Sequence, residues 1–411
     1  MVNVLSVFII ASALLFIGIL AEYLFKRFGI PDILLLIATG FALGPFGFGI
    51  VEPSSIAPIA PIFTTFALLF LLFDGAFNID IISFIKGIGK GMSITLLNFF
   101  VSAIVITGIT LLFGIPLLQA MLLGFILGGI SSAFVIPIIK NLRIKRETYT
   151  ILTLESAITD VLCIVAAITL IEIITLNHFS TTLVLKKLTA LFVIAGILGI
   201  LAGIVWIVVI KRIFKKFQSY MLTIAYVLLL YTITEYLNGN GALATLFFGL
   251  VLQNSKKLIA FVKKEGSFSV TSPQEKLFYN QISFFLKTFF FAYIGILLDF
   301  SNHTALIIGA VIGVTLLITR HASRVLTKGM LPYDRSVINA IFARGLAAAV
   351  LAQVAIGSGI ENADIISKVT ITTIMFTIIL SSVHLFTVNH QQGKNKMVSR
   401  RNRTRQRPHP A

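Results

Sequence analysis

Residues 153–160 read TLESAITD, and they place two carboxylates, Glu155 and Asp160, in the middle of an apolar run that extends over 148–174. An ionised side chain at the centre of a bilayer costs several kcal/mol and is retained mostly for function. Ser156 and Asp160 are four residues apart, so a helix places them on one face, with Thr159 beside them. A carboxylate surrounded by hydroxyl and backbone oxygens is a ligand set that hard cations such as sodium prefer. The run is therefore predicted to be a membrane helix that carries a cation site.

The composition of the whole chain is that of a membrane protein. Of its 411 residues, 57% are hydrophobic and 12% are charged, whereas about a quarter of the residues of a soluble domain are charged. The net charge of +17 comes from Lys and Arg clusters between apolar runs. A nucleic-acid-binding protein would instead gather its basic residues on one polar face. The single cysteine, Cys163, excludes an intrachain disulfide, and no Cys/His cluster has zinc spacing.

About thirteen runs are long enough to cross a hydrocarbon core, so we expect an all-α polytopic membrane protein. Runs 1–6 and 8–13 can form two six-helix units joined by run 7. A shift of seven spans inverts the topology, which predicts inverted repeats whose corresponding helices are broken near the midplane. The expected breaks lie at 128–132 with Pro137 in run 5, and at Arg344, Gly345 and Gly357 in run 12. The runs are 4–24, 31–49, 57–79, 92–113, 117–139, 148–174, 188–210, 219–236, 240–254, 281–298, 304–325, 336–357 and 366–388, of which 219–236 and 240–254 alternatively form a re-entrant pair.

The basic residues predict the orientation, because translocated short loops avoid Lys and Arg. Most of the 33 basic residues fall in alternate loops, counted from Lys26 and Arg27, and in the tail. The N-terminus is therefore expected outside the plasma membrane, and the C-terminus with its basic tail in the cytoplasm. Lys287 lies near the expected cytoplasmic start of run 10, where its ammonium group is predicted to reach the interface.

The runs hold further ionisable residues, chiefly Asp74, Arg320 and Arg344. One interpretation is that Glu155 and Asp160 pair with the two arginines and only fix helix packing. Glu155 alone is better explained by such a pair, which leaves Asp160 free. Because burial disfavours the charged form of a carboxyl group, Asp160 can hold either a cation or a proton. A site that holds one of the two at a time is an exchanger in its simplest form.

The quoted residues resemble the Glu-Ser-x-x-Asn-Asp signature of the sodium/proton exchangers, within the monovalent cation/proton antiporter superfamily. Other stretches agree in order over about residues 28–380. They are Ile30-Pro31, Gly40-x-x-x-Gly44-Pro45-x-Gly47, Phe73-Asp74-Gly75, Phe290-x-x-x-x-Gly295, Thr319-Arg320 and Arg344-Gly345-Leu346-Ala347. Single glycine patterns are weak, since glycine is common in membrane helices for packing alone, but the motifs of runs 6 and 12 together are specific.

The resemblance implies a homodimer in which a core domain moves against a static gate or dimerisation domain. Asp160 would carry the cation and the proton, Ser156 would be a cation ligand with Thr159 and Ser132 close by, and Asp74 would reach the ion directly or through water. Glu155 would form a structural pair with Arg320, and Arg344 would stabilise the crossing of the broken helices. The implied division is gate at 1–80 and 217–300, core at 81–180 and 301–390, linker helix at 181–216, and basic tail at 391–411.

Two departures from the family pattern concern the cation. Thr159 replaces the usual Asn or Asp, and 132–134 reads SAF where Thr-Asp-Pro is common. Losing that Asp leaves sodium, lithium and potassium open. An arginine at position 320, where charge-moving members use a titrating lysine, favours electroneutral exchange, because arginine does not deprotonate in proteins.

The predicted function is sodium/proton antiport without cofactor, nucleotide or nucleic acid, and a potassium/proton antiporter is an alternative. A sodium-coupled symporter would need a more polar cavity. An intramembrane enzyme would need both carboxylates free, and a channel has no use for a single titrating acid. We therefore expect a transporter and not an enzyme.

Overall fold

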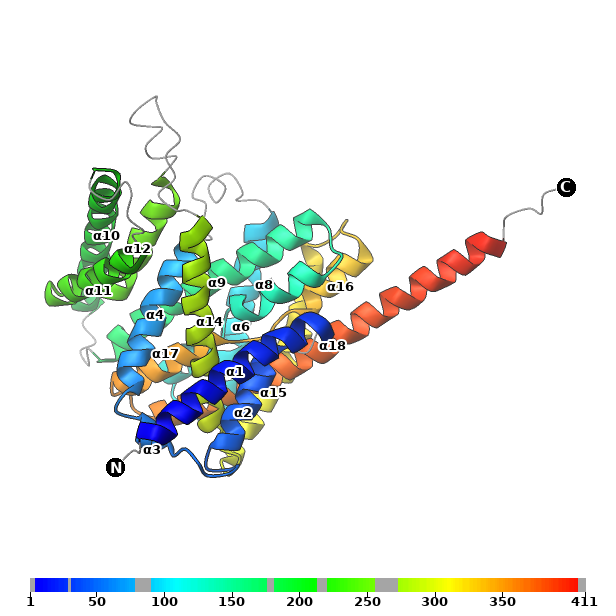
Figure 1. Ribbon diagram of the computed structural model, residues 1–411, viewed down its shortest axis with the longest axis horizontal. Helices are drawn as coiled ribbons and strands as arrows, with labels where there is room; N and C mark the ends of the chain where they lie inside the picture. Colours follow the sequence, from blue (N-terminus) through cyan, green and yellow to red (C-terminus); the bar gives the residue numbers. More distant parts are fainter. Residues whose placement is uncertain are drawn as a thin grey trace.

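The computed structural model describes residues 4–28, 31–77, 90–175, 181–212, 220–255 and 273–405, and within these ranges its regular structure is helical (Figure 1). The prediction of an all-α protein is confirmed. The helices are α1 (Val4–Phe28), α2 (Asp32–Leu43), α3 (Pro53–Ile56), α4 (Ala60–Phe77), α6 (Lys90–Leu112), α7 (Leu117–Ile126), α8 (Ser132–Asn141), α9 (Arg146–Thr175), α10 (Thr181–Arg212), α11 (Tyr220–Tyr236), α12 (Gly241–Gln253), α14 (Pro273–Ile296), α15 (His303–Thr319), the 3₁₀ helix η1 (Arg320–Val325), α16 (Pro332–Ala340), α17 (Leu346–Gly357) and α18 (Ala363–Arg405).

Every predicted apolar run falls on a helix or on a pair of half-helices. Among the described residues, six helices are long and apolar enough to cross a membrane by length and composition: α9, α15 with η1, and the greater parts of α1, α6, α10 and α18. The other runs fall on shorter helices, and the number of thirteen spans stays a prediction. Run 31–49 is shorter than expected, because α2 ends at Leu43. Pro45 disfavours helical geometry in the residue before it, and Gly44 is extended, with ψ of −179°.

Two predicted runs are each interrupted, and the interruptions cross. Residues 127–131 separate α7 from α8, and residues 341–345 separate α16 from α17. The Ser131 amide donates to the Ala343 carbonyl at 2.9 Å, which joins the two segments directly. A Cβ atom on Gly345 would overlap the Ser131 side chain, so glycine permits this close approach.

The positions of the breaks were predicted only in part. Pro137 lies inside α8 and does not end it. Gly357 is the last residue of α17 and takes no part in the break of run 12. The glycines at 128–129 and Gly345 were the informative signals, because they allow the backbones to approach each other.

Several helices pack as close pairs. The pairs α6 with α7, α8 with α9, and α15 with α18 surround the crossing, while α2 packs on α14, and α12 packs on α4 and α10. At the α2–α14 contact, a Cβ atom on Gly40 would overlap the Ala292 carbonyl. Figure 1 shows α10, α11 and α12 at one end of the molecule, and α18 extending beyond the other helices at the opposite end. The helix α17 contacts both α4 and α9.

Candidate functional site

The Asp160 carboxylate on α9 lies at the N-terminus of the half-helix α8. The Ser132 hydroxyl donates to Asp160 Oδ2 at 2.6 Å, and the Ser132 amide approaches the same oxygen at 3.4 Å. Ser132 is the first residue of α8. The free amides and the dipole of a helix N-terminus stabilise a negative charge. The broken helix therefore creates a favourable place for an ionised carboxylate inside the protein.

The other predicted ligands on α9 are turned to other partners. The fully buried Ser156 hydroxyl donates to the Thr153 carbonyl at 3.1 Å. Thr159 Oγ1 accepts a hydrogen bond of 3.1 Å from the Ile130 amide in the crossing segment. Thus Ser132 contacts Asp160, while Thr159 holds the segment that leads to Ser132.

Asp74, the remaining predicted ligand, lies in α4, and its side chain is outside the described part of the structure. The helix α4 contacts α9 and α17. The backbone of Asp74 is therefore on an element that packs against the helix of Asp160.

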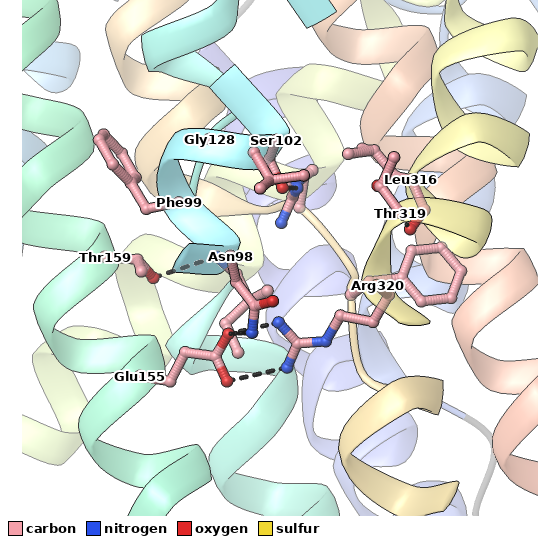
Figure 2. A pocket seen from close by; sticks show the side chains of 13 residues that line it. Asn98, Phe99, Ser102, Gly128, Glu155, Thr159, Leu316, Thr319 and Arg320 are labelled. Atoms are coloured by element: carbon pink, nitrogen blue, oxygen red, sulfur yellow. Dashed lines mark hydrogen bonds and ion pairs between the residues drawn. The ribbon is translucent and has the colours of Figure 1, made fainter. Parts of the chain in front are cut away.

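Glu155 and Arg320 form a buried two-pronged ion pair (Figure 2). Arg320 Nη2 donates to Glu155 Oε2 at 2.8 Å, and Arg320 Nη1 donates to Glu155 Oε1. Glu155 is fully buried and Arg320 is 5% exposed. Two further bonds complete the arrangement: Asn98 Nδ2 donates to Glu155 Oε1, and Arg320 Nε donates to the Ile338 carbonyl, both at 2.9 Å. Parallel N–H···O bonds of this kind are the strongest geometry for arginine and carboxylate.

Arg344 is held by uncharged groups at the crossing. Its Nη1 donates to the Gly129 carbonyl at 2.6 Å, and its Nη2 donates to Ser102 Oγ at 3.0 Å. None of the ion pairs in the described part of the chain includes Arg344. Gly129 follows the end of α7, where free carbonyls carry partial negative charge and favour a cation. Arg344 thus neutralises the C-terminal end of one half-helix, while Ser132 and Asp160 occupy the N-terminal end of the next.

A small internal cavity, with room for about one water molecule, lies next to the Glu155–Arg320 pair (Figure 2). Asp160 is not among its lining residues, whereas the neighbouring Thr159 is. Its polar lining comes from α6, α9, α15, η1 and the crossing: Asn98, Ser102, Glu155, Thr159, Thr319, Arg320 and Arg344.

Three buried residues with polar contacts, two at this cavity and one elsewhere, escaped the sequence reasoning. Asn98 and Ser102 lie within the apolar run of α6, and an amide side chain in such a run is a usable signal. Asp32 was missed because it stands at the beginning of run 31–49. It forms an ion pair with Lys287, and the two side chains are 8% and 15% exposed. The position of Lys287 at the interface stays a prediction. In the structure Lys287 lies within α14, which begins at Pro273, and its ammonium group is paired with Asp32.

The chain is similar to known sodium/proton antiporters in sequence pattern and fold. The profile of the family described as "Sodium/hydrogen exchanger, transmembrane" matches residues 11–389, which include every predicted site residue. The fold matches a structure at pH 8 of the sodium proton antiporter MjNhaP1 from Methanocaldococcus jannaschii, with a TM-score of 0.74, 21% identity, and coverage of 93% of this chain and 100% of that chain. An electron-microscopy structure of the same antiporter gives a TM-score of 0.72, 20% identity, and coverage of 95% and 98%.

Proposed function

Because the chain belongs to the sodium/hydrogen exchanger family, a family of transporters, we propose that its Asp160 carboxylate carries sodium in one direction and a proton in the other. The contact of Asp160 with the N-terminus of α8 is the observation that carries this proposal. Glu155 and Asp32 each have a basic partner, whereas Asp160 has none in the described part of the chain. A carboxylate without a fixed counter-ion needs a mobile one. Sodium or a proton supplies it.

The ligands around a bound sodium ion follow from the same geometry. The Ser132 hydroxyl, which now donates to Asp160, can rotate and offer its lone pairs to a cation beside the carboxylate. Ser156 is one turn before Asp160. Its hydroxyl would bind the ion after giving up its hydrogen bond to the Thr153 carbonyl. Asp74 of α4 would approach the ion from the facing helix, directly or through water. Such an all-oxygen site suits a hard monovalent cation.

Transport requires that this site open to one side of the membrane at a time. We infer that α6–α9 and α15–α18 form a core that moves against a gate of α1–α4, α11, α12 and α14, with α10 as the linker. The close pairs α6 with α7, α15 with α18 and α17 with α18 in the core, and α2 with α14 and α4 with α12 in the gate, support this division. One contact between the groups joins α14 to α17, where Tyr293 Oη donates to Gln353 Oε1 at 3.3 Å.

Cross-linking this contact is expected to stop transport. In the double variant Tyr293→Cys/Gln353→Cys, treatment with a short bismaleimide should remove most of the sodium-dependent proton flux, because the linker ties the core to the gate. Each single variant, treated in the same way, is the control, and it also reports any effect at the buried Cys163. Full flux through a protein that electrophoresis shows to be cross-linked would mean that these two helices do not move apart.

Exchange is expected to be electroneutral. If Asp160 alone changes its occupant, the loaded core carries either a carboxylate with one monovalent cation or a protonated carboxylate, and the two states have equal charge. Arg320 stays protonated and Thr159 cannot titrate. Each net charge moved would otherwise contribute about 2.3 kcal/mol per 100 mV. In proteoliposomes clamped with potassium and valinomycin, the sodium/proton exchange rate should be the same at zero and at an imposed potential.

The same proteoliposomes test the function itself. With an imposed pH gradient and no valinomycin, addition of sodium should dissipate the gradient, and lithium and potassium are compared in turn. Dissipation by potassium alone would replace sodium with potassium as the substrate. No response to any of the three cations would contradict the proposed exchange, and acceleration by voltage would require a second proton carrier.

We further propose a plasma-membrane homodimer with its N-terminus outside and its C-terminus in the cytoplasm. The basic residues between the helices support this orientation. A C-terminal tag should be protected from protease in intact cells and become accessible when the cells are opened. Cross-linking in native membranes should give a band of twice the monomer mass.

A further inference from the structure

We propose that Ser102 on α6 is a positioning residue that sets the cation affinity of Asp160 by holding Arg344. The inference rests on the proposed role of Asp160. It assigns to α6 a part in ion binding, although no described side chain of α6 is hydrogen-bonded to Asp160.

The first step is the hydrogen bond between Ser102 and Arg344. Ser102 is 8% exposed and Arg344 is 2% exposed, and a hydrogen bond of 3.0 Å joins Arg344 Nη2 to the Ser102 hydroxyl. Arg344 Nε has no hydrogen-bond partner among the described residues. The guanidinium group is therefore held by two hydrogen bonds, one to Ser102 and one to the Gly129 carbonyl.

The second step leads from Arg344 to Asp160. Gly129 begins a segment whose successive amides are all bonded to other elements. The Gly129 amide donates to Cys163 Sγ at 3.0 Å, and the Ile130 amide donates to Thr159 Oγ1 at 3.1 Å. The next residues are Ser131, bonded to the second broken helix, and Ser132, which donates to Asp160. The Arg344 guanidinium holds a carbonyl at the start of this segment. Its orientation therefore affects where the Ser132 hydroxyl stands.

Ser102 differs from Thr95 and Thr110 of the same helix in the partner of its hydroxyl. Thr95 donates to the Gly91 carbonyl and Thr110 donates to the Ile106 and Thr107 carbonyls, which are all within α6. Hydroxyl groups in membrane helices commonly bond to their own backbone in this way. The Ser102 hydroxyl instead accepts from a charged group of another element, 242 residues away along the chain.

Removing the hydroxyl should weaken sodium binding without removing the carrier. In Ser102→Ala, a buried N–H group of Arg344 loses its hydrogen-bond acceptor. The guanidinium group then shifts toward a different acceptor. Hydrogen bonds to charged groups are strong enough for this loss to raise the sodium KM about five- to tenfold. The maximal rate per folded protein should change by less than about twofold, because Asp160 is intact.

The test compares three variants in proteoliposomes and in detergent. Ser102→Ala should raise the sodium KM and shift the pH dependence of exchange. Ser102→Thr keeps the hydroxyl and should restore both, since its methyl group can enter the adjoining cavity. Thr110→Val removes a buried hydroxyl bonded only within α6 and should leave both unchanged. A Ser102→Ala protein with wild-type KM and pH dependence would overturn the proposal, as would a KM that stays high in Ser102→Thr.

A binding measurement keeps this inference separate from the proposed function. Stabilisation of the purified protein by sodium, followed as Tm against sodium concentration, reports affinity without transport. If the wild-type protein binds sodium but does not exchange it, the proposed function fails, and the affinities of the three variants still decide the role of Ser102. Equal sodium affinity of Ser102→Ala and wild type in this measurement would refute that role.

Discussion

Replacing Asp160 with asparagine is expected to abolish sodium-dependent collapse of an imposed pH gradient, down to the rate of liposomes without protein. Asparagine has nearly the same shape and can still accept the hydrogen bond from the Ser132 hydroxyl. It cannot take up a proton or provide a negative charge to a cation. The variant should therefore fold normally, with a Tm close to that of the wild type, and lose only the exchange.

A matched acid on the same helix provides the control. Glu172 lies in the last turn of α9 and is partly buried, away from the crossing. Glu172→Gln removes one negative charge from α9, as Asp160→Asn does, and should keep most of the exchange rate. Exchange by Asp160→Asn at the wild-type rate would show that Asp160 is not the carrier.

Truncating Glu155 is expected to damage the fold and not the ion site specifically. Glu155→Ala leaves Arg320 buried without its carboxylate and removes the acceptor of Asn98. Breaking a buried ion pair by removing one partner costs about 3–5 kcal/mol. We expect low yields of folded protein and a Tm well below that of the wild type, measured in detergent by thermal unfolding.

A double variant separates the charge from the contact. In Glu155→Gln/Arg320→Gln both charges are gone, so the penalty of an unpaired guanidinium disappears and part of the lost stability should return. The Thr110→Val protein serves as a core variant without charge loss. A stable Glu155→Ala protein whose sodium affinity alone is altered would place Glu155 in the transport site.

Much of the architecture was accessible from the sequence because a membrane leaves few choices. A chain segment in lipid must satisfy its own backbone hydrogen bonds, so an apolar run of sufficient length becomes a helix. Glycines at depth predicted a break in run 5 and another in run 12, and the structure has them at 127–131 and 341–345, although Pro137 and Gly357 take no part. The end of α2 at Leu43 was not predicted, because the local turn geometry at Gly44 sets it. The start of α14 at Pro273 was not predicted either, because its first turn is polar and lies outside the apolar run.

The depth of the two acids on α9 is likewise a prediction from sequence alone, since it follows from their place within one apolar run. The partners of these acids were decided by tertiary structure. Composition and spacing left Arg320 and Arg344 equivalent as counter-ions, and only the resemblance to a family paired Glu155 with Arg320. In the fold, Arg320 meets Glu155 across 165 residues of chain, and Lys287 meets Asp32 across 255. Arg344 instead donates hydrogen bonds to the Gly129 carbonyl and the Ser102 hydroxyl. Such pairings depend on which helix faces pack together, and helical periodicity within a single run carries no information about the helix that it will face.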